Sequence, residues 1–229
     1  MLTKKKKLSR KEIKEDKLVS TYYKVYGYFE ENRSRLLTYG GILVVVALAV
    51  IYYINHNKEI NQEAGLALSR VIDSYDQGAY LEAIEGKAGT EVIGLKKIVE
   101  DYGSTENGET AKIYLANSYN RLGKFEDAFK YYKSYSGDIP MLKAASLAGQ
   151  AGYYAYKNDY EKAAELYRDA AHISQYNVDN PDYLLKSAIN YINAGQNQKA
   201  KELLETIKND YKTSSASREV DRYLALTNT

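Results

Sequence analysis

The chain has 229 residues, with 25 Tyr, two Pro, two His and neither Cys nor Trp. The lack of Cys excludes disulfides, thiolate catalysis and sulfur-ligated metals, and a formal net charge of +2 is too small to indicate a nucleic-acid-binding protein. Few Pro and abundant Ala, Lys, Glu and Tyr favour an all-α fold.

Residues 1–35 form a basic arm. They contain eleven Lys or Arg and five acidic residues, a net charge of +6, and the total of +2 leaves −4 for the rest of the chain. Within the arm, apolar residues recur at helical spacing on one face, with Lys17 and Lys24 off it. This pattern predicts a short amphipathic helix on a membrane surface, and the alternative is a solvated tether. The face consists of Leu18, Tyr22, Val25, Tyr26 and Phe29.

Residues 36–54 are free of charge. As a helix these residues span roughly 28 Å, close to the hydrocarbon thickness of a bilayer. A core helix is rarely apolar on every face over such a length, and an "ALA" cleavage site at 47–49 would lie inside the apolar run. A retained transmembrane helix is therefore preferred to a core helix or a cleaved signal.

The charge imbalance predicts the orientation of this span. Basic flanks stay in the cytoplasm, so we expect a cytoplasmic arm 1–35 and an external domain 57–229. In a bacterium this arrangement corresponds to the inner membrane, with the domain in the periplasm.

The external domain begins with degenerate helices over 59–103. A first helix is expected from Glu59 to Asp76, and "GAYLEAI" from Gly78 onward has the features of a turn. A further helix is expected from Thr90, as the N-cap, to Tyr102, before Gly103.

Three later segments of the chain repeat one pattern. In each segment, a residue that tolerates positive φ stands five positions before an Ala residue. The tolerant residues are Gly123, Asn158 and Gly195, and the Ala residues are at 128, 163 and 200. "LANSYNRLGKFEDAFKYYKSYSGDIP" at 115–140 carries nearly the full pattern of the tetratricopeptide repeat, and related segments follow at 149–171 and 186–207. The chain resembles that family, with repeats at about 107–140, 142–175 and 181–213. The resemblance implies an α-solenoid of helical hairpins, which a helix over 215–226 would cap.

The sequence contains few of the residue patterns that catalysis or metal binding requires. His56 and His172 stand apart, and no phosphate-binding loop, nucleophile elbow or zinc-binding helix motif is present. We therefore expect no enzyme activity, no catalytic residues, no metal site and no cofactor.

Such an array is expected to bind proteins in a groove lined by the first helix of each repeat. The groove would be mainly apolar with a few amides, and it lacks the Lys cluster of repeats that clamp a carboxylate, so it favours a hydrophobic or extended polypeptide. In the alternative, the lining packs against the terminal helix. The expected lining is Ile113, Asn117, Arg121, Ala148, Gly152, Tyr156, Leu185, Ile189 and Asn193.

The join between span and solenoid carries a second resemblance. "YFEENRSRLLTYGGILVVVALAVIYYINHNKEINQEAG" over 28–65 resembles the ancillary subunit family of the bacterial Sec translocon, whereas the Lys-rich extension departs from it. The resemblance implies an adaptor that passes secreted chains to periplasmic chaperones, with translocon subunits, chaperones or secreted chains as partners. The alternative is a scaffold for another envelope assembly, in cell division or cell-wall synthesis.

Overall fold

The computed structural model of the chain describes residues 10–227, without the side chains of residues 10–16 and 18. The Lys-rich stretch at 4–7 and the side chain of Leu18 therefore lie outside the described residues. The described part is all-α, apart from an isolated antiparallel bridge between Gly86 and Ile93. Its helices are α1 (Arg10–Asp76), α2 (Tyr80–Glu85), α3 (Leu95–Tyr102), α4 (Glu106–Arg121), α5 (Phe125–Ser134), α6 (Pro140–Tyr156), α7 (Tyr160–His172), α8 (Asn180–Asn193), α9 (Asn197–Asp210), a 3-10 turn (Ala216–Glu219) and α10 (Val220–Leu226).

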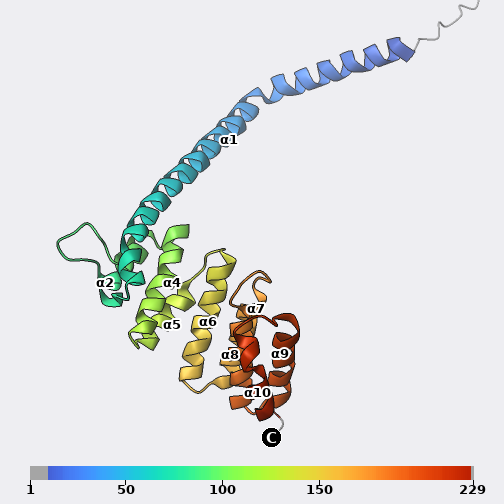
Figure 1. Cartoon of the computed structure of the whole chain (residues 1–229). Coiled ribbons are helices and arrows are strands. Elements are labelled where there is room, and N and C mark those ends of the chain that lie inside the picture. Colours follow the sequence, from blue (N-terminus) through green and yellow to red (C-terminus); the bar gives the residue numbers. More distant parts are fainter. Residues whose placement is uncertain (1–9, 228–229) are drawn as a thin grey trace, which may run out of the picture. The chain divides into compact units, whose positions relative to one another are not determined.

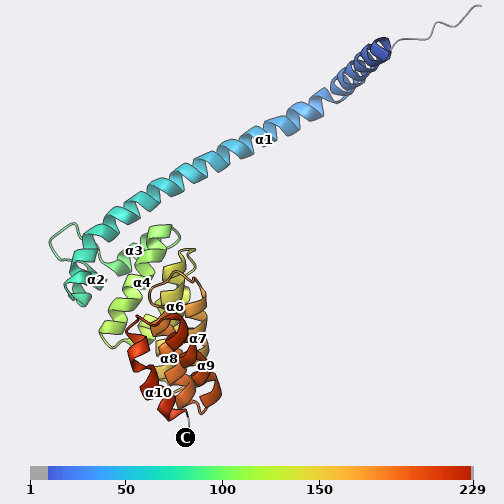
Figure 2. The same cartoon turned by 45° about the vertical axis from the view of Figure 1, so that its right-hand side comes forward.

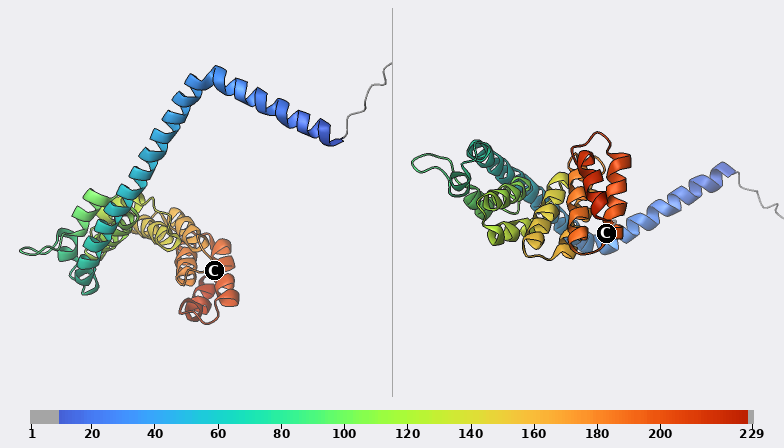
Figure 3. Two further views of the ribbon diagram at one scale, coloured as in Figure 1. Left: turned by 90° about the horizontal axis from the view of Figure 1, so that it is seen from above. Right: turned by 60° about the horizontal axis from the view of Figure 1, so that its bottom comes forward.

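The chain divides into two compact units, one ending at His56 and the other beginning at Asn57. In the first unit, α1 carries the apolar residues 36–54, and their side chains are exposed. The helix from Val19 onward contains an 18-residue window with a mean hydropathy of 2.2, none of it buried, so its length and composition suit a membrane span. The blue part of α1 bends in every view (Figures 1 and 3).

The second unit is a stack of helical hairpins, α4–α5, α6–α7 and α8–α9, in which each hairpin packs on the next (Figures 1 and 2). One turn recurs in all of them. Gly123, Asn158 and Gly195 have φ of 72°, 61° and 72°, as the sequence predicted, and Gly78 repeats the turn between α1 and α2 with φ of 76°. The next residue donates its amide to the carbonyl five residues earlier, as in Lys124 N to Tyr119 O at 2.9 Å. This is the Schellman arrangement, and it closes each first helix in the same way.

Two clusters of buried side chains hold the stack together. One combines the end of α1 with α2–α5 and includes Val71, Ile98 and Leu115, while the other combines α6–α10 and includes Tyr191 and Leu204. Alanines with no exposed surface lie at the helix crossings, where a small side chain lets the backbones approach closely. The cluster members at the far end are Ala216 and Val220, so the 3-10 turn and α10 cover the last hairpin.

Two details differ from the expectations. The helix predicted from Thr90 begins at Leu95, because the Gly86–Ile93 bridge and a bond from Lys87 N to Val92 O hold residues 87–92 in a loop. The Thr90 hydroxyl instead donates to Lys87 O at 2.8 Å. The terminal segment is also not a single α-helix, because its first turn is the 3-10 turn Ala216–Glu219.

Candidate protein-binding groove

A cavity of about 240 Å³ opens along the first helices of the three hairpins. The first helices α4, α6 and α8 supply most of its lining, and α5 and α7 each supply one tyrosine. The lining consists of Asn117, Asn120, Tyr132, Ala145, Ala148, Gly149, Gly152, Tyr167, Tyr183 and Lys186. The cavity is thus a feature of the stack, since no single hairpin provides its walls.

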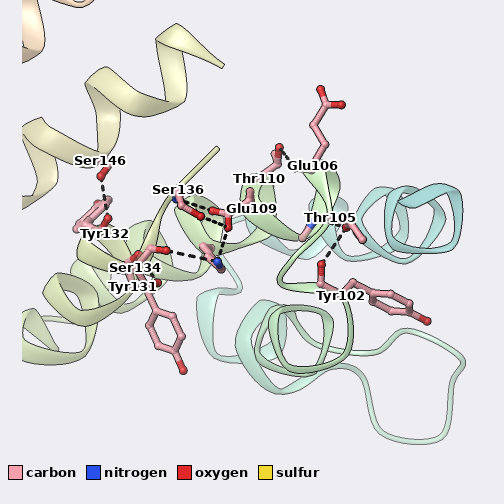
Figure 4. Close-up of polar contacts among 12 residues, drawn as sticks. Tyr102, Thr105, Glu106, Glu109, Thr110, Tyr131, Tyr132, Ser134, Ser136 and Ser146 are labelled. Atoms are coloured by element: carbon pink, nitrogen blue, oxygen red, sulfur yellow. Dashed lines mark hydrogen bonds and ion pairs between the residues drawn. The ribbon is translucent and has the colours of Figure 1, made fainter. Parts of the chain in front are cut away.

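Small residues on α6 make room for the tyrosines. A Cβ atom on Gly149 would lie 2.4 Å from the ring of Tyr132, so only glycine permits this packing. The Tyr132 hydroxyl donates to Asn117 Oδ1 at 2.5 Å. The hydroxyl of Ser146 donates to Tyr132 O at 2.7 Å (Figure 4). Tyr132 is therefore fixed at both ends, by a side chain of α4 and a side chain of α6.

A similar arrangement holds the next hairpin. The Ser187 hydroxyl of α8 donates to Ala164 O of α7 at 2.7 Å, as Ser146 of α6 does to α5. The ring of Tyr167 lies 5.8 Å from Lys186 Nζ, within the range of a cation–π interaction. These bonds place the ammonium group of Lys186 at the edge of the groove.

The groove presents neutral hydroxyl groups rather than phenolates. Burial raises the pKa of Tyr132 and Tyr167 above the ordinary value, and burial raises the pKa of Tyr183 to about 12. These tyrosines stay protonated at physiological pH. They are almost fully buried, with 4%, 8% and 8% of their surfaces exposed, and the Tyr132 hydroxyl already donates to Asn117 Oδ1. Together with the two amides and Lys186, this lining suits a polypeptide segment that presents apolar side chains and backbone carbonyls.

The comparisons with known proteins agree with this architecture. The tetratricopeptide repeat family profile matches residues 182–214, which include most of α8 and all of α9. The crystal structure of nearly identical TPR-like repeats from a Podosopora anserina protein assigned as a kinesin light chain superposes with a TM-score of 0.55, covering 73% of this chain and 86% of that one at 18% identity.

The solenoid is of the tetratricopeptide type.

The crystal structure of a point variant of the same Podosopora anserina repeats gives a TM-score of 0.54 at 19% identity, covering 75% of this chain and 86% of that one. At these identities the likeness concerns the fold alone. No curated protein sequence matches the chain significantly. Solenoids of this type present extended concave surfaces.

The tetratricopeptide solenoid brings only part of the predicted lining together. Asn117, Ala148 and Gly152 line the cavity. Ile113 and Leu185 instead belong to the core, with 3% and 7% of their surface exposed, because they face neighbouring helices of the stack.

The other four predicted residues also lie outside the cavity lining. Ile189 is half-buried against the core of α6–α10, and Arg121 and Asn193 are exposed near the ends of α4 and α8. Tyr156 packs against Phe125 with ring centroids 4.6 Å apart.

Seven residues of the cavity lining were not predicted from the sequence, and three of them are tyrosines. Tyr132 and Tyr167 occupy the same position of successive repeats. Their recurrence, together with the glycines at 149 and 152, was the available signal. Tyr183, Asn120 and Lys186 carried no comparable signal, because only the packing of the hairpins on one another brings them to one cavity.

A second cavity of about 550 Å³ lies beside the loop between α5 and α6, but its central carboxylate is fully engaged. Glu109 Oε1 lies 2.6 Å from Lys112 Nζ and accepts the Ser136 hydroxyl at 2.7 Å, while Oε2 accepts Ser136 N at 2.8 Å (Figure 4). The network joins α4 to the following loop. Within the described side chains, no group of three or more His, Asp or Glu residues is placed to hold a metal ion.

Proposed function

We propose that the protein is a membrane-anchored adaptor whose groove binds extended polypeptide segments on the outer side of a bacterial inner membrane. The observation that carries the proposal is the cavity shared by α4–α8. Its volume of about 240 Å³ is below the roughly 300–1,000 Å³ of small-molecule sites, so it suits one or two side chains of a longer ligand. The apolar, exposed segment of α1 supports the anchor.

Within this proposal, the partner assembly is the Sec translocon. The support is the order of elements in the chain, in which a short polar and aromatic stretch, an apolar span and the repeats follow one another without an intervening linker. The adaptor would receive emerging secreted chains in the groove and pass them to periplasmic chaperones.

The test isolates the full chain from native membranes in mild detergent and identifies the proteins that remain bound. Translocon subunits and periplasmic chaperones are expected. Their absence, with cell-division or cell-wall proteins in their place, would overturn the translocon role and support the scaffold alternative.

A matched pair of variants tests the groove. Lys186 and Lys199 are both exposed, and each places its ammonium group over a tyrosine ring, at 5.8 Å from Tyr167 and 5.2 Å from Tyr191. Lys186 lines the cavity and Lys199 does not. Lys186→Ala is expected to weaken binding of a co-purified partner about fivefold, roughly 1 kcal/mol, while Lys199→Ala leaves it unchanged. Equal effects of the two variants in a binding titration would exclude the groove as the site.

A further inference from the structure

The segment of α1 over residues 19–29 presents a dense set of apolar and aromatic side chains to the surroundings. Between 49% and 68% of each of these residues is exposed. Their rings contact each other, with Tyr22 stacked on Tyr26 at 6.2 Å and edge-on to Tyr23 at 5.7 Å. The set consists of Val19, Tyr22, Tyr23, Val25, Tyr26, Tyr28 and Phe29. An apolar patch of this kind on a helix marks an interaction surface.

The helix separates this surface from its basic side chains. At about 100° per residue, the apolar side chains gather on one half of the helix, and the opposite half carries cations. The apolar half contains Val19, Tyr22, Val25, Tyr26 and Phe29, with Tyr23 and Glu30 at its edge and Arg33 one turn beyond Phe29. The opposite half contains Lys17, Lys24, Tyr28, Glu31 and Arg35. A wide aromatic face backed by basic residues is typical of helices that lie in a membrane interface.

The position of the segment in the chain selects a lipid surface as its occupant. The apolar run begins at Leu36, seven residues after Phe29 on the same helix, so a bilayer that holds the run is within reach of the segment. Tyrosine rings favour the headgroup region, and the cations attract anionic headgroups.

Side-chain bonds between the segment and the apolar run favour a change of direction. Asn32 Nδ2 donates to Tyr28 O at 3.0 Å, and the Thr38 hydroxyl donates to Ser34 O at 2.9 Å. Bonds of this kind to the carbonyl four residues earlier bend helices, and the blue part of α1 is bent (Figure 3).

We infer that residues 19–29 form an interfacial helix that lies in the headgroup region of an anionic leaflet, with the aromatic face toward the acyl chains. This inference rests on the membrane attachment in the proposed function. It assigns a lipid-binding role to a segment that the groove and the repeats do not use.

The lack of Trp allows a direct test on the full chain, because a single introduced Trp is the unique reporter. Phe29→Trp places it on the aromatic face, and the matched control Tyr28→Trp places it one residue away on the basic half. Each variant is reconstituted in nanodiscs of phosphatidylcholine and phosphatidylglycerol, with and without lipids brominated near the headgroup. We expect Phe29→Trp to emit at shorter wavelength and to be quenched at least about twofold more strongly than Tyr28→Trp.

The other results discriminate between occupants. Equal, weak quenching of both variants would overturn the inference in favour of a solvated tether. A short-wavelength emission of Phe29→Trp without bromine quenching would overturn it in favour of a protein partner or a second copy. Discs of phosphatidylcholine alone should reduce the quenching of Phe29→Trp, and an unchanged value would contradict the role of the cations. Failure of the chain to float with vesicles would instead refute the membrane attachment itself.

Discussion

Glu109 is the buried acidic residue on which the contact between α4 and the α5–α6 loop depends. Its side chain is 9% exposed and that of Lys112 is 13% exposed, so this ion pair is shielded from water, unlike the surface pair of Lys162 and Glu165. Burial alone would raise the pKa of Glu109, but the hydrogen bonds from Lys112 and Ser136 outweigh it and lower the pKa below its ordinary value of 4.5.

The lowered pKa predicts how stability depends on pH. Because the folded state holds the charged form of Glu109, its contribution is complete above the ordinary pKa of 4.5 and is lost as the pH falls through the lower folded-state value. Glu109→Gln should lower the free energy of unfolding at neutral pH by about 1–3 kcal/mol and weaken the loss of stability toward acid. Urea titrations between neutral and acid pH provide the measurement.

Glu165→Gln is the control for this experiment. Its side chain is 39% exposed and lies 3.6 Å from Lys162, so a change below about 0.5 kcal/mol is expected. The same loss in both variants would mean that the bonds to Ser136 contribute nothing.

At the scale of elements, the recurring turn sets the hairpin geometry. Gly195 has φ of 72°, and a Cβ atom added to it would meet no other atom within 4 Å, so substitution there acts through backbone conformation alone. Gly195→Ala should destabilise the protein by about 1–2 kcal/mol, because an alanine is disfavoured in the left-handed region. Thermal or urea unfolding followed by circular dichroism measures this effect.

The chain supplies the control for that substitution, since Asn158 occupies the equivalent turn with φ of 61°. Gly195→Asn should lose less stability than Gly195→Ala, because asparagine tolerates this conformation better. Equal losses for the two would refute the conformational explanation.

The same turns explain how far the sequence could predict the fold. A hairpin depends on residues close in sequence, so Gly123, Asn158 and Gly195 indicated the turns directly. The start of α3 depends on a bridge between Gly86 and Ile93, and a local capping signal at Thr90 did not reveal it. The groove depends on contacts such as Gly149 with Tyr132, which join neighbouring hairpins. Helical spacing placed Leu185 on the first helix but did not distinguish the concave surface from the packed one.

At the scale of the whole molecule, the predicted topology places the basic arm 1–35 and the domain 57–229 on opposite sides of a membrane. The chain lacks Cys, so a single introduced thiol reports its own compartment. Val178 lies in the loop between α7 and α8 and is 83% exposed. Val178→Cys should react with a membrane-impermeant maleimide in cells with a permeabilised outer membrane, to roughly the extent seen after lysis.

The control for this labelling is Ser9→Cys, in the basic arm, which should react only after lysis. The opposite pattern, with Ser9→Cys labelled in intact inner membranes and Val178→Cys protected, would reverse the orientation.

The groove lining extends from Asn117 on α4 to Lys186 on α8 and so includes residues of all three hairpins. A polypeptide ligand bound in the groove would contact all three hairpins at once and link them to one another. Occupancy should then stiffen the solenoid against bending and pulling, because separating two hairpins would also require the ligand to be released. If a bound polypeptide were pulled, for example by its own folding, the tension would pass to the solenoid. Hydrogen bonds between hairpins, such as the one from the Ser187 hydroxyl to Ala164 O, would then carry part of that tension.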